Sequence, residues 1–217
     1  NVFGDLIRSE IIPVIALREV FRQAEQSAII RNAHAVNSGE CPDLGNKQGD
    51  CFFLARRDAV RLADTIVELC GTRLPNNMGI PATEIQVLSP TRKGAAGTEE
   101  LNRALQAALN PPAKYKKEIT FGDTTFRVGD KVMHIKNNYS LEWRCEQGGQ
   151  EGMGVFNGDM GFILDIDREE KVVSVMYDDD RHVEYMYQQL EELELAYCLT
   201  VHKSQGSEFP CVVMPVV

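Results

Sequence analysis

One turn of the sequence gathers side chains that could bind phosphate groups. Residues 200–209 read TVHKSQGSEF and lie between two apolar segments that are typical of buried strands. Hydroxyl, imidazole, ammonium and amide groups in one turn could donate to phosphate or nucleotide oxygens, and Glu208 could accept from a sugar hydroxyl. A polar connection between two strands is the alternative, and pattern counting alone leaves both interpretations open.

A second candidate, residues 89–98, follows a short apolar run. It contains the cations Arg92 and Lys93, and then Gly94 and Gly97, whose backbone can approach an anion closely. The segment leads into a helix N-terminus, which favours negative charge. It is not a phosphate loop of the GxxxxGK[ST] type, because that order is absent from the sequence. On this segment alone, the favoured interpretation is a strand-to-helix turn with solvated basic residues.

A third candidate is Arg22, inside an amphipathic pattern over residues 15–37. An arginine on a helix is usually one member of a surface ion pair. The functional alternative is an arginine finger, which reaches the transferring γ-phosphate of a nucleotide from a neighbouring domain.

The elements that must position these residues follow the order α/β, then β, then α/β. Helices are predicted at 15–37, closed by Asn37-Ser38-Gly39, at 58–69, ended by Gly71 before a loop at 75–83, and at 99–109, with Thr98 as N-cap. Strands are predicted at 51–54, 85–88, 130–135, 161–166, 172–177, 182–186, 193–199 and 209–216. The polar stretch 137–154 predicts a mobile loop, and Asn157-Gly158 predicts a hairpin turn. The simplest interpretation is one α/β domain with an inserted small barrel.

The composition sets wider bounds. A net charge of −9 over 217 residues argues at first against a nucleic-acid partner, but a local basic strip matters more, and many acidic residues gather at 178–194. No apolar run approaches the ~20 residues of a membrane span. Six dispersed cysteines without a C-x-x-C pair indicate reduced thiols in a cytoplasmic protein, and no metal site is expected. The start at Asn1 suggests an excised fragment.

These segments together resemble the RecD-like and TraA-like DNA helicases of superfamily 1. The resemblance is carried by residues 21–27 (FRQAEQS), 30–39, 88–97 (LSPTRKGAAG), 126–133 (FRVGDKVM), 155–161 (VFNGDMG) and 196–213, which is similar to helicase motif V. It implies an α/β fold in which a RecA-like second motor domain, of the P-loop NTPase type, holds an inserted small β-barrel of the Src-homology-3 type. The implied boundaries are 1–116 and 192–217 for the motor domain and 117–191 for the barrel.

The resemblance also implies roles for single residues. Arg22 would be the catalytic residue that reaches the γ-phosphate, and Gln23, Gly206 and Glu208 would lie at the ATP. The residues that would hold single-stranded DNA are Arg92, Lys93, Gly94, Gly97, Thr200, His202, Lys203 and Ser204.

The whole protein would use ATP and Mg²⁺ to move 5′ to 3′ along single-stranded DNA in repair or recombination. Its other partners would be an N-terminal RecA-like domain of the same protein and subunits of the RecB or RecC type. No membrane is expected among its partners. Phosphoryl transfer needs the phosphate loop and the magnesium ligands together, and this sequence contains neither. The chain alone is therefore expected not to hydrolyse ATP.

Other interpretations stay open. They are the helicase part of a conjugative relaxase, an RNA helicase of the same superfamily, and a non-catalytic nucleic-acid-binding or protein-interaction module. Arg22 together with Glu208 favours the motor, because a binding module needs neither a γ-phosphate sensor nor a ribose acceptor. Trp143 beside Arg144 either stacks on a base or covers an end of the barrel.

Overall fold

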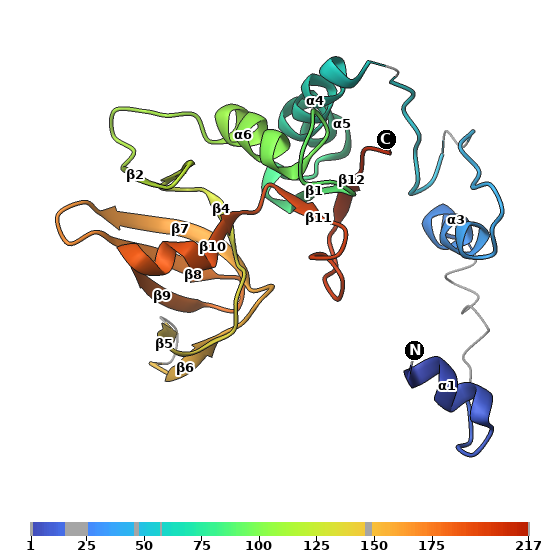
Figure 1. Ribbon diagram of the computed structural model, residues 1–217. Coiled ribbons are helices and arrows are strands. Elements are labelled where there is room, and N and C mark those ends of the chain that lie inside the picture. Colours follow the sequence, from blue (N-terminus) through green and yellow to red (C-terminus); the bar gives the residue numbers. More distant parts are fainter. Residues whose placement is uncertain (1, 16–25, 46–47, 57, 146–148, 217) are drawn as a thin grey trace. The chain divides into compact units, whose positions relative to one another are not determined.

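The chain of the computed structural model divides into two units, Asn1–Ala55 and Arg56–Val217 (Figure 1). The structure describes residues 2–15, 26–45, 48–56, 58–145 and 149–216. Among these residues, no helix is long and apolar enough to cross a lipid bilayer.

The first unit contains the helices α1 (Val2–Ser9) and α3 (Ala28–Asn37). Ser27 caps α3, and the Asp50 carboxylate accepts hydrogen bonds from the Ser27 hydroxyl and from the Ala28 backbone N–H, at 2.5 and 2.8 Å. These hydrogen bonds hold the pKa of Asp50 below its usual value, and the hydrogen bond from Ser27 has the largest effect. Within the predicted helix 15–37, residues 28–37 are confirmed, and residues 16–25 lie outside the described residues.

The strand predicted at 51–54 is wrong. These residues form no strand, and the side chains of Phe52 and Phe53 are more than half exposed. An apolar run becomes a strand only where a neighbouring backbone pairs with it, and none does so here among the described residues.

One part of the second unit is a three-stranded parallel sheet of order β11-β1-β12. Its strands are β1 (Ile85–Ser89), β11 (Cys198–Thr200) and β12 (Cys211–Val213), and the helices that pack with it are α4 (Ala59–Glu68) and α6 (Thr98–Leu109). The shared core includes Ile66, Val87, Leu101 and Leu105, each at most 2% exposed. This core holds α6 against β1, and so determines where the loop between them lies.

Two predicted ends in this part are wrong. The segment after α4 does not end at Gly71 but continues through the π-helical turn η1 (Leu69–Arg73) into α5 (Leu74–Met78), which covers part of the predicted loop. Pro75 lies in the first turn of α5, directly after the π-helical turn. The N-cap of α6 is Gly97 rather than Thr98, so the helix begins one residue earlier than predicted.

A second region, in which all paired strands are antiparallel, follows α6. A small sheet pairs β2 (Glu118–Phe121) with β3 (Thr124–Arg127). A seven-stranded sheet has the order β10-β4-β7-β8-β9-β5-β6. Its strands are β4 (Lys131–His134), β5 (Asn138–Cys145), β6 (Glu151–Val155), β7 (Met160–Asp167), β8 (Val172–Tyr177), β9 (Arg181–Met186) and β10 (Leu193–Leu195). Between β9 and β10 lie the 3₁₀ turns η3 (Tyr187–Glu192). In the described part of the chain, the edge strands β10 and β6 are not paired with each other.

The polar stretch 137–154 was predicted as a mobile loop, and that prediction is wrong for most of it. Most of its described residues form β5 and β6, whereas residues 146–148 lie outside the described residues. β5 pairs with β9 as well, which brings Trp143 opposite Val183. Asn157 and Gly158 do form a turn, but β6 and β7, which the turn joins, pair with other strands, so it is not a hairpin turn. Pairing between segments that are distant in the sequence decides both the strands within 137–154 and the kind of turn at Asn157-Gly158. A local sequence pattern does not predict such pairing.

The strand predicted at 193–199 is two strands in two different sheets. β10 pairs with β4 in the seven-stranded sheet, whereas β11 pairs with β1 in the three-stranded sheet. The chain therefore passes from one sheet to the other at Ala196 and Tyr197, both of which are buried.

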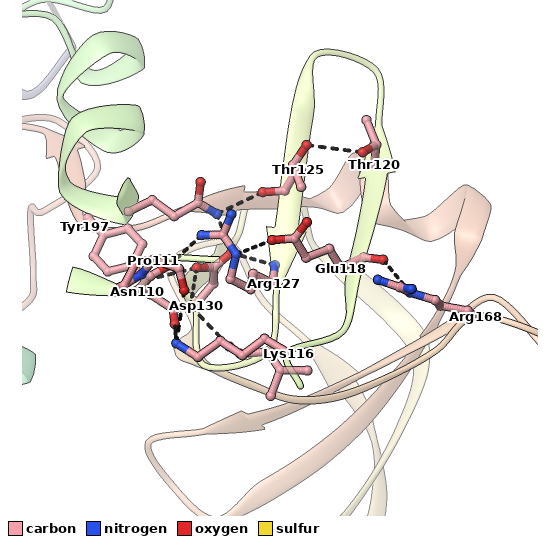
Figure 2. A network of polar contacts seen from close by, with 12 residues as sticks. Asn110, Pro111, Lys116, Glu118, Thr120, Thr125, Arg127, Asp130, Arg168 and Tyr197 are labelled. Carbon is pink, nitrogen blue, oxygen red and sulfur yellow. Dashed lines mark hydrogen bonds and ion pairs between the residues drawn. The ribbon is translucent and has the colours of Figure 1, made fainter. Parts of the chain in front are cut away.

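One buried carboxylate joins the two sheets at this crossing (Figure 2). Asp130 is fully buried and accepts four hydrogen bonds, from the side chains of Gln106 and Asn110, the Arg127 backbone N–H and the Tyr197 hydroxyl, at 2.6 to 3.0 Å. Burial raises the pKa of this carboxyl group, and the four hydrogen bonds act against that shift. Its four donors come from α6, the residue after α6, the end of β3 and the segment before β11.

We expect Asp130→Asn to lower the free energy of unfolding by about 2–3 kcal/mol, because an amide N–H would replace one acceptor and face a donor. Asp123→Asn, in the exposed turn between β2 and β3, is the matched control and should change it by less than about 0.5 kcal/mol. Urea unfolding followed by circular dichroism measures both. Equal stability of the two variants would contradict a structural role for Asp130.

Candidate nucleic-acid interface

The two predicted phosphate-binding segments leave the same edge of the three-stranded sheet. β1 and β11 are parallel neighbours, with Ser89 opposite Thr200, and the Val201 backbone N–H donates to the Ser89 carbonyl at 3.1 Å. The carboxyl ends of parallel strands meet at one edge, where ligands bind in open α/β sheets. Residues 89–98 and 200–207 therefore begin side by side, although they are far apart in the sequence.

The loop 89–98 is closed by its own hydrogen bonds. The Ser89 hydroxyl donates to the Ala96 carbonyl at 2.6 Å, and the Thr98 N–H donates to the Thr91 carbonyl at 3.1 Å. Gly94 has a φ of +92°, and a Cβ added to Gly97 would lie 2.5 Å from the carbonyl oxygen of Arg92. Both glycines are therefore needed for this backbone path.

The cations of this loop, Arg92 and Lys93, are exposed. A backbone that is held by internal hydrogen bonds presents these side chains from a defined place at the start of α6. The arrangement suits an anion that approaches from solvent, because the helix N-terminus and the two cations carry charge of the same sign.

The turn 200–207 is folded on itself in the same way. The Lys203 and Ser204 backbone N–H groups donate to the Thr200 carbonyl, at 2.9 and 3.2 Å. The Ser204 hydroxyl donates to the Val201 carbonyl at 2.9 Å, so its proton is already used within the turn. The imidazole of His202 is exposed.

Glu194 brings one cation of each segment to a single carboxylate. Its Oε2 lies 2.6 Å from Nζ of Lys203, and its Oε1 lies 3.8 Å from Nη2 of Arg92. In the sequence, this residue is only one member of the acidic stretch 178–194. The sequence could not predict its contact with Arg92, because the two residues are more than a hundred positions apart.

Asn102 is a second residue whose role the sequence did not reveal. From α6 its side-chain amide donates to the Cys198 carbonyl at 2.9 Å and accepts from the Cys198 N–H at 2.8 Å, as a neighbouring strand would. It thereby fixes β11, which carries the turn 200–207, to the helix that follows the loop 89–98. Burial raises the pKa of the Cys198 thiol to about 12, so this side chain stays protonated near neutral pH.

The predicted nucleotide-binding residues are only partly placed. Arg22 and Gln23 lie outside the described residues. Gly206, with a φ of +91°, and Glu208 are both exposed after β11. Within the described ranges, no group of three or more histidine, cysteine or acidic side chains could hold a metal ion.

The structure favours a packing role for Trp143. Its half-buried ring packs on the core of the seven-stranded sheet, and a Cβ on Gly152 would lie 2.4 Å from it. The guanidinium of Arg181 lies 6.0 Å from the ring centroid. Arg144 beside it is paired with Glu151 at 3.5 Å.

Two family models match the second unit. The one described as the SH3 domain of ATP-dependent RecD-like DNA helicases matches residues 101–177, and the one described as the UvrD-like helicase C-terminal domain matches residues 195–217. The turn 200–207 lies in the second match, and α6 lies almost wholly in the first. The second unit therefore has the α/β fold of a helicase C-terminal region with an SH3-type segment.

Two relatives agree with these matches. The ATP-dependent RecD2 DNA helicase of Deinococcus radiodurans is 32% identical over 207 residues, which are 95% of this chain and 25% of that protein. The RecBCD enzyme subunit RecD of Buchnera aphidicola is 23% identical over 124 residues, 57% of this chain and 19% of that protein. A solved Pif1 helicase from Bacteroides, in complex with ADP-AlF3 and ssDNA, is 16% identical with a TM-score of 0.49, over 94% of this chain and 46% of that one.

The chain belongs to the RecD-like DNA helicases, which confirms the resemblance stated from its motifs. It spans about a quarter or less of the length of the curated relatives named above.

Gly97→Ala tests the geometry of the loop 89–98. Because its Cβ would overlap the backbone of Arg92 and Lys93, we expect a loss of about 1–3 kcal/mol in the free energy of unfolding. Gly71→Ala is the control, since its Cβ would meet only the Leu109 side chain at an ordinary 3.5 Å, and it should be neutral or stabilising. Thermal unfolding compares the two, and a Gly97→Ala protein as stable as the control would show that the loop is built differently.

Proposed function

We propose that this chain is the C-terminal motor part of an ATP-dependent 5′–3′ DNA helicase, and that its loops after β1 and β11 hold single-stranded DNA. The observation that carries the proposal is the meeting of these two loops at one edge of the parallel sheet. Three cations on these loops, Arg92, Lys93 and Lys203, could contact successive backbone phosphates. Thr200, His202, Ser204 and the backbone at Gly94 and Gly97 would complete the contact.

In this proposal, residues 1–116 and 192–217 form a second RecA-like motor domain, and residues 117–191 form a small barrel of the Src-homology-3 type. The parallel pairing of β1 with β11 and β12 supports the joining of the first and last segments in one sheet. The pairing of β10 with β4 means that the boundary near residue 192 lies just before a strand shared with the inserted part.

ATP and Mg²⁺ would bind between this domain and an N-terminal RecA-like domain of the same protein. Arg22 would reach the γ-phosphate, and Gln23, Gly206 and Glu208 would contact the nucleotide. The other domain would supply the phosphate cradle and the magnesium ligands. Closure would be favoured while the γ-phosphate is present and lost on hydrolysis, so each cycle would change the distance between two grips on the strand.

The proposed setting is DNA repair or recombination in the cytoplasm, with or without subunits of the RecB or RecC type. The exposed cations of the loop 89–98 and the similarity to RecD-like helicases support DNA as the partner. The free state of all six cysteines is in keeping with a reducing compartment.

We expect Lys93→Ala to weaken binding of a labelled dT oligomer of about 15 nucleotides roughly three- to tenfold at low salt. One lost phosphate contact should also reduce the slope of log K against log salt by about 0.7. Fluorescence anisotropy across a salt series measures both quantities. Lys171→Ala, in the turn between β7 and β8, removes the same charge elsewhere and should bind like the unchanged chain. Absence of binding at low salt, or an equal loss of affinity in both variants, would count against the proposed binding site for single-stranded DNA.

The 217-residue chain alone should show no ATP hydrolysis, with or without single-stranded DNA, because phosphoryl transfer needs the cradle and the metal ligands. Phosphate release from pure material in the presence of Mg²⁺ measures this. The control is the same assay on a protein that also carries the N-terminal RecA-like domain, in which Arg22→Ala should abolish turnover. Turnover by the 217 residues alone that disappears with Arg22→Ala would contradict the division of the ATP site.

A further inference from the structure

Glu194 is held in a position from which its carboxylate can reach both loops. It lies in β10, opposite Met133 of β4, and its neighbours Leu193 and Leu195 pack on the core of the seven-stranded sheet. Successive side chains of a strand point to opposite faces. The strand pairing therefore directs Glu194 away from that core.

Its carboxylate occupies the place that an anion would take between the two loops. One oxygen faces Lys203 at 2.6 Å and the other faces Arg92 at 3.8 Å, so the two negatively charged oxygens are divided between two cations. The Lys203 side chain is 27% exposed, the Glu194 side chain 39% and the Arg92 side chain 65%. Solvent and a second anion can therefore reach all three groups.

Its neighbours in the acidic stretch have other partners. Glu191 is paired with Lys136 at 2.6 Å, and Glu192 accepts from the Asn138 side chain at 2.9 Å. Within the part of the chain that the structure describes, Glu194 is the acidic side chain paired with the cations of these two loops. Lys93 has no ion-pair partner among the same residues.

We propose that Glu194 is an internal competitor for DNA phosphate, which occupies Arg92 and Lys203 until a strand displaces it. This inference rests on the proposed single-strand grip and adds how its affinity is set. Lys93 makes the first contact with an incoming phosphate, and the carboxylate of Glu194 leaves the other two cations as the strand settles. A residue of the seven-stranded sheet thus weakens a grip made by loops of the three-stranded sheet, which favours release of the strand in each cycle.

The test compares Glu194→Gln with Glu191→Gln. The second variant removes the same charge, but from the ion pair between Glu191 and Lys136. Binding of the labelled dT oligomer is measured by anisotropy across a salt series. Binding of inorganic tripolyphosphate, an anion without bases or sugars, is measured by calorimetry. We expect Glu194→Gln to bind both probes roughly two- to tenfold more tightly than Glu191→Gln at low salt, which is the scale of a partly exposed ion pair. The salt slope for dT should steepen by about 0.7 for each additional phosphate that the freed cations bind.

A third variant locates the effect. In a Lys203→Ala background, Glu194→Gln should bring a clearly smaller gain, because Arg92 is then the one remaining cation of the pair for which the two anions compete. An equal gain with and without Lys203 would overturn the inference, since it would mean that only the overall charge matters.

The outcomes separate this inference from the proposed function. If Glu194→Gln binds both probes no better than Glu191→Gln, the competition is refuted, and measurable binding of dT would still support the grip. If Glu194→Gln gains affinity for tripolyphosphate while no variant binds dT, the carboxylate does compete at an anion site, and the single-strand function is refuted.

Discussion

The second unit depends on the burial of one carboxylate, that of Asp130, at the place where the three-stranded and seven-stranded sheets meet. A buried negative charge is tolerated only where several donors converge on it, and here four do. Two of these donors, Gln106 and Asn110, belong to α6 and the residue after it, and Tyr197 precedes β11. The same network therefore fixes the helix that follows the loop 89–98 and the strand that precedes the turn 200–207.

The crossing beside Asp130 explains how a site can be built from two distant segments. The chain leaves the seven-stranded sheet after β10 and enters the three-stranded sheet as β11, with two buried residues, Ala196 and Tyr197, between them. Asn102 then binds both backbone groups of Cys198. Because β11 is fixed next to β1, the turn 200–207 has to lie beside the loop 89–98, and the proposed single-stranded DNA could contact both segments.

The charge of the chain also has a structural explanation. A net charge of −9 is at odds with DNA binding until the acidic residues are assigned to their partners. Asp179 pairs with Arg181, Glu191 with Lys136, and Glu194 with Lys203. Part of the acidic stretch is therefore paired with cations of the same chain, whereas Lys93 is exposed and has no ion-pair partner among the described residues.

The sequence by itself determined the features that depend on neighbouring residues. The apolar run Val172–Tyr177 predicted β8 with its observed bounds, and the motifs predicted the RecD-like family. Tertiary structure decided what depends on pairing between distant segments: the division of residues 193–199 between two sheets, and the pairing of β5 with β9 in a stretch whose polar sequence predicted a loop. It also decided which cations Glu194 meets, because an ion pair needs only closeness in space, and the fold alone brings these loops together.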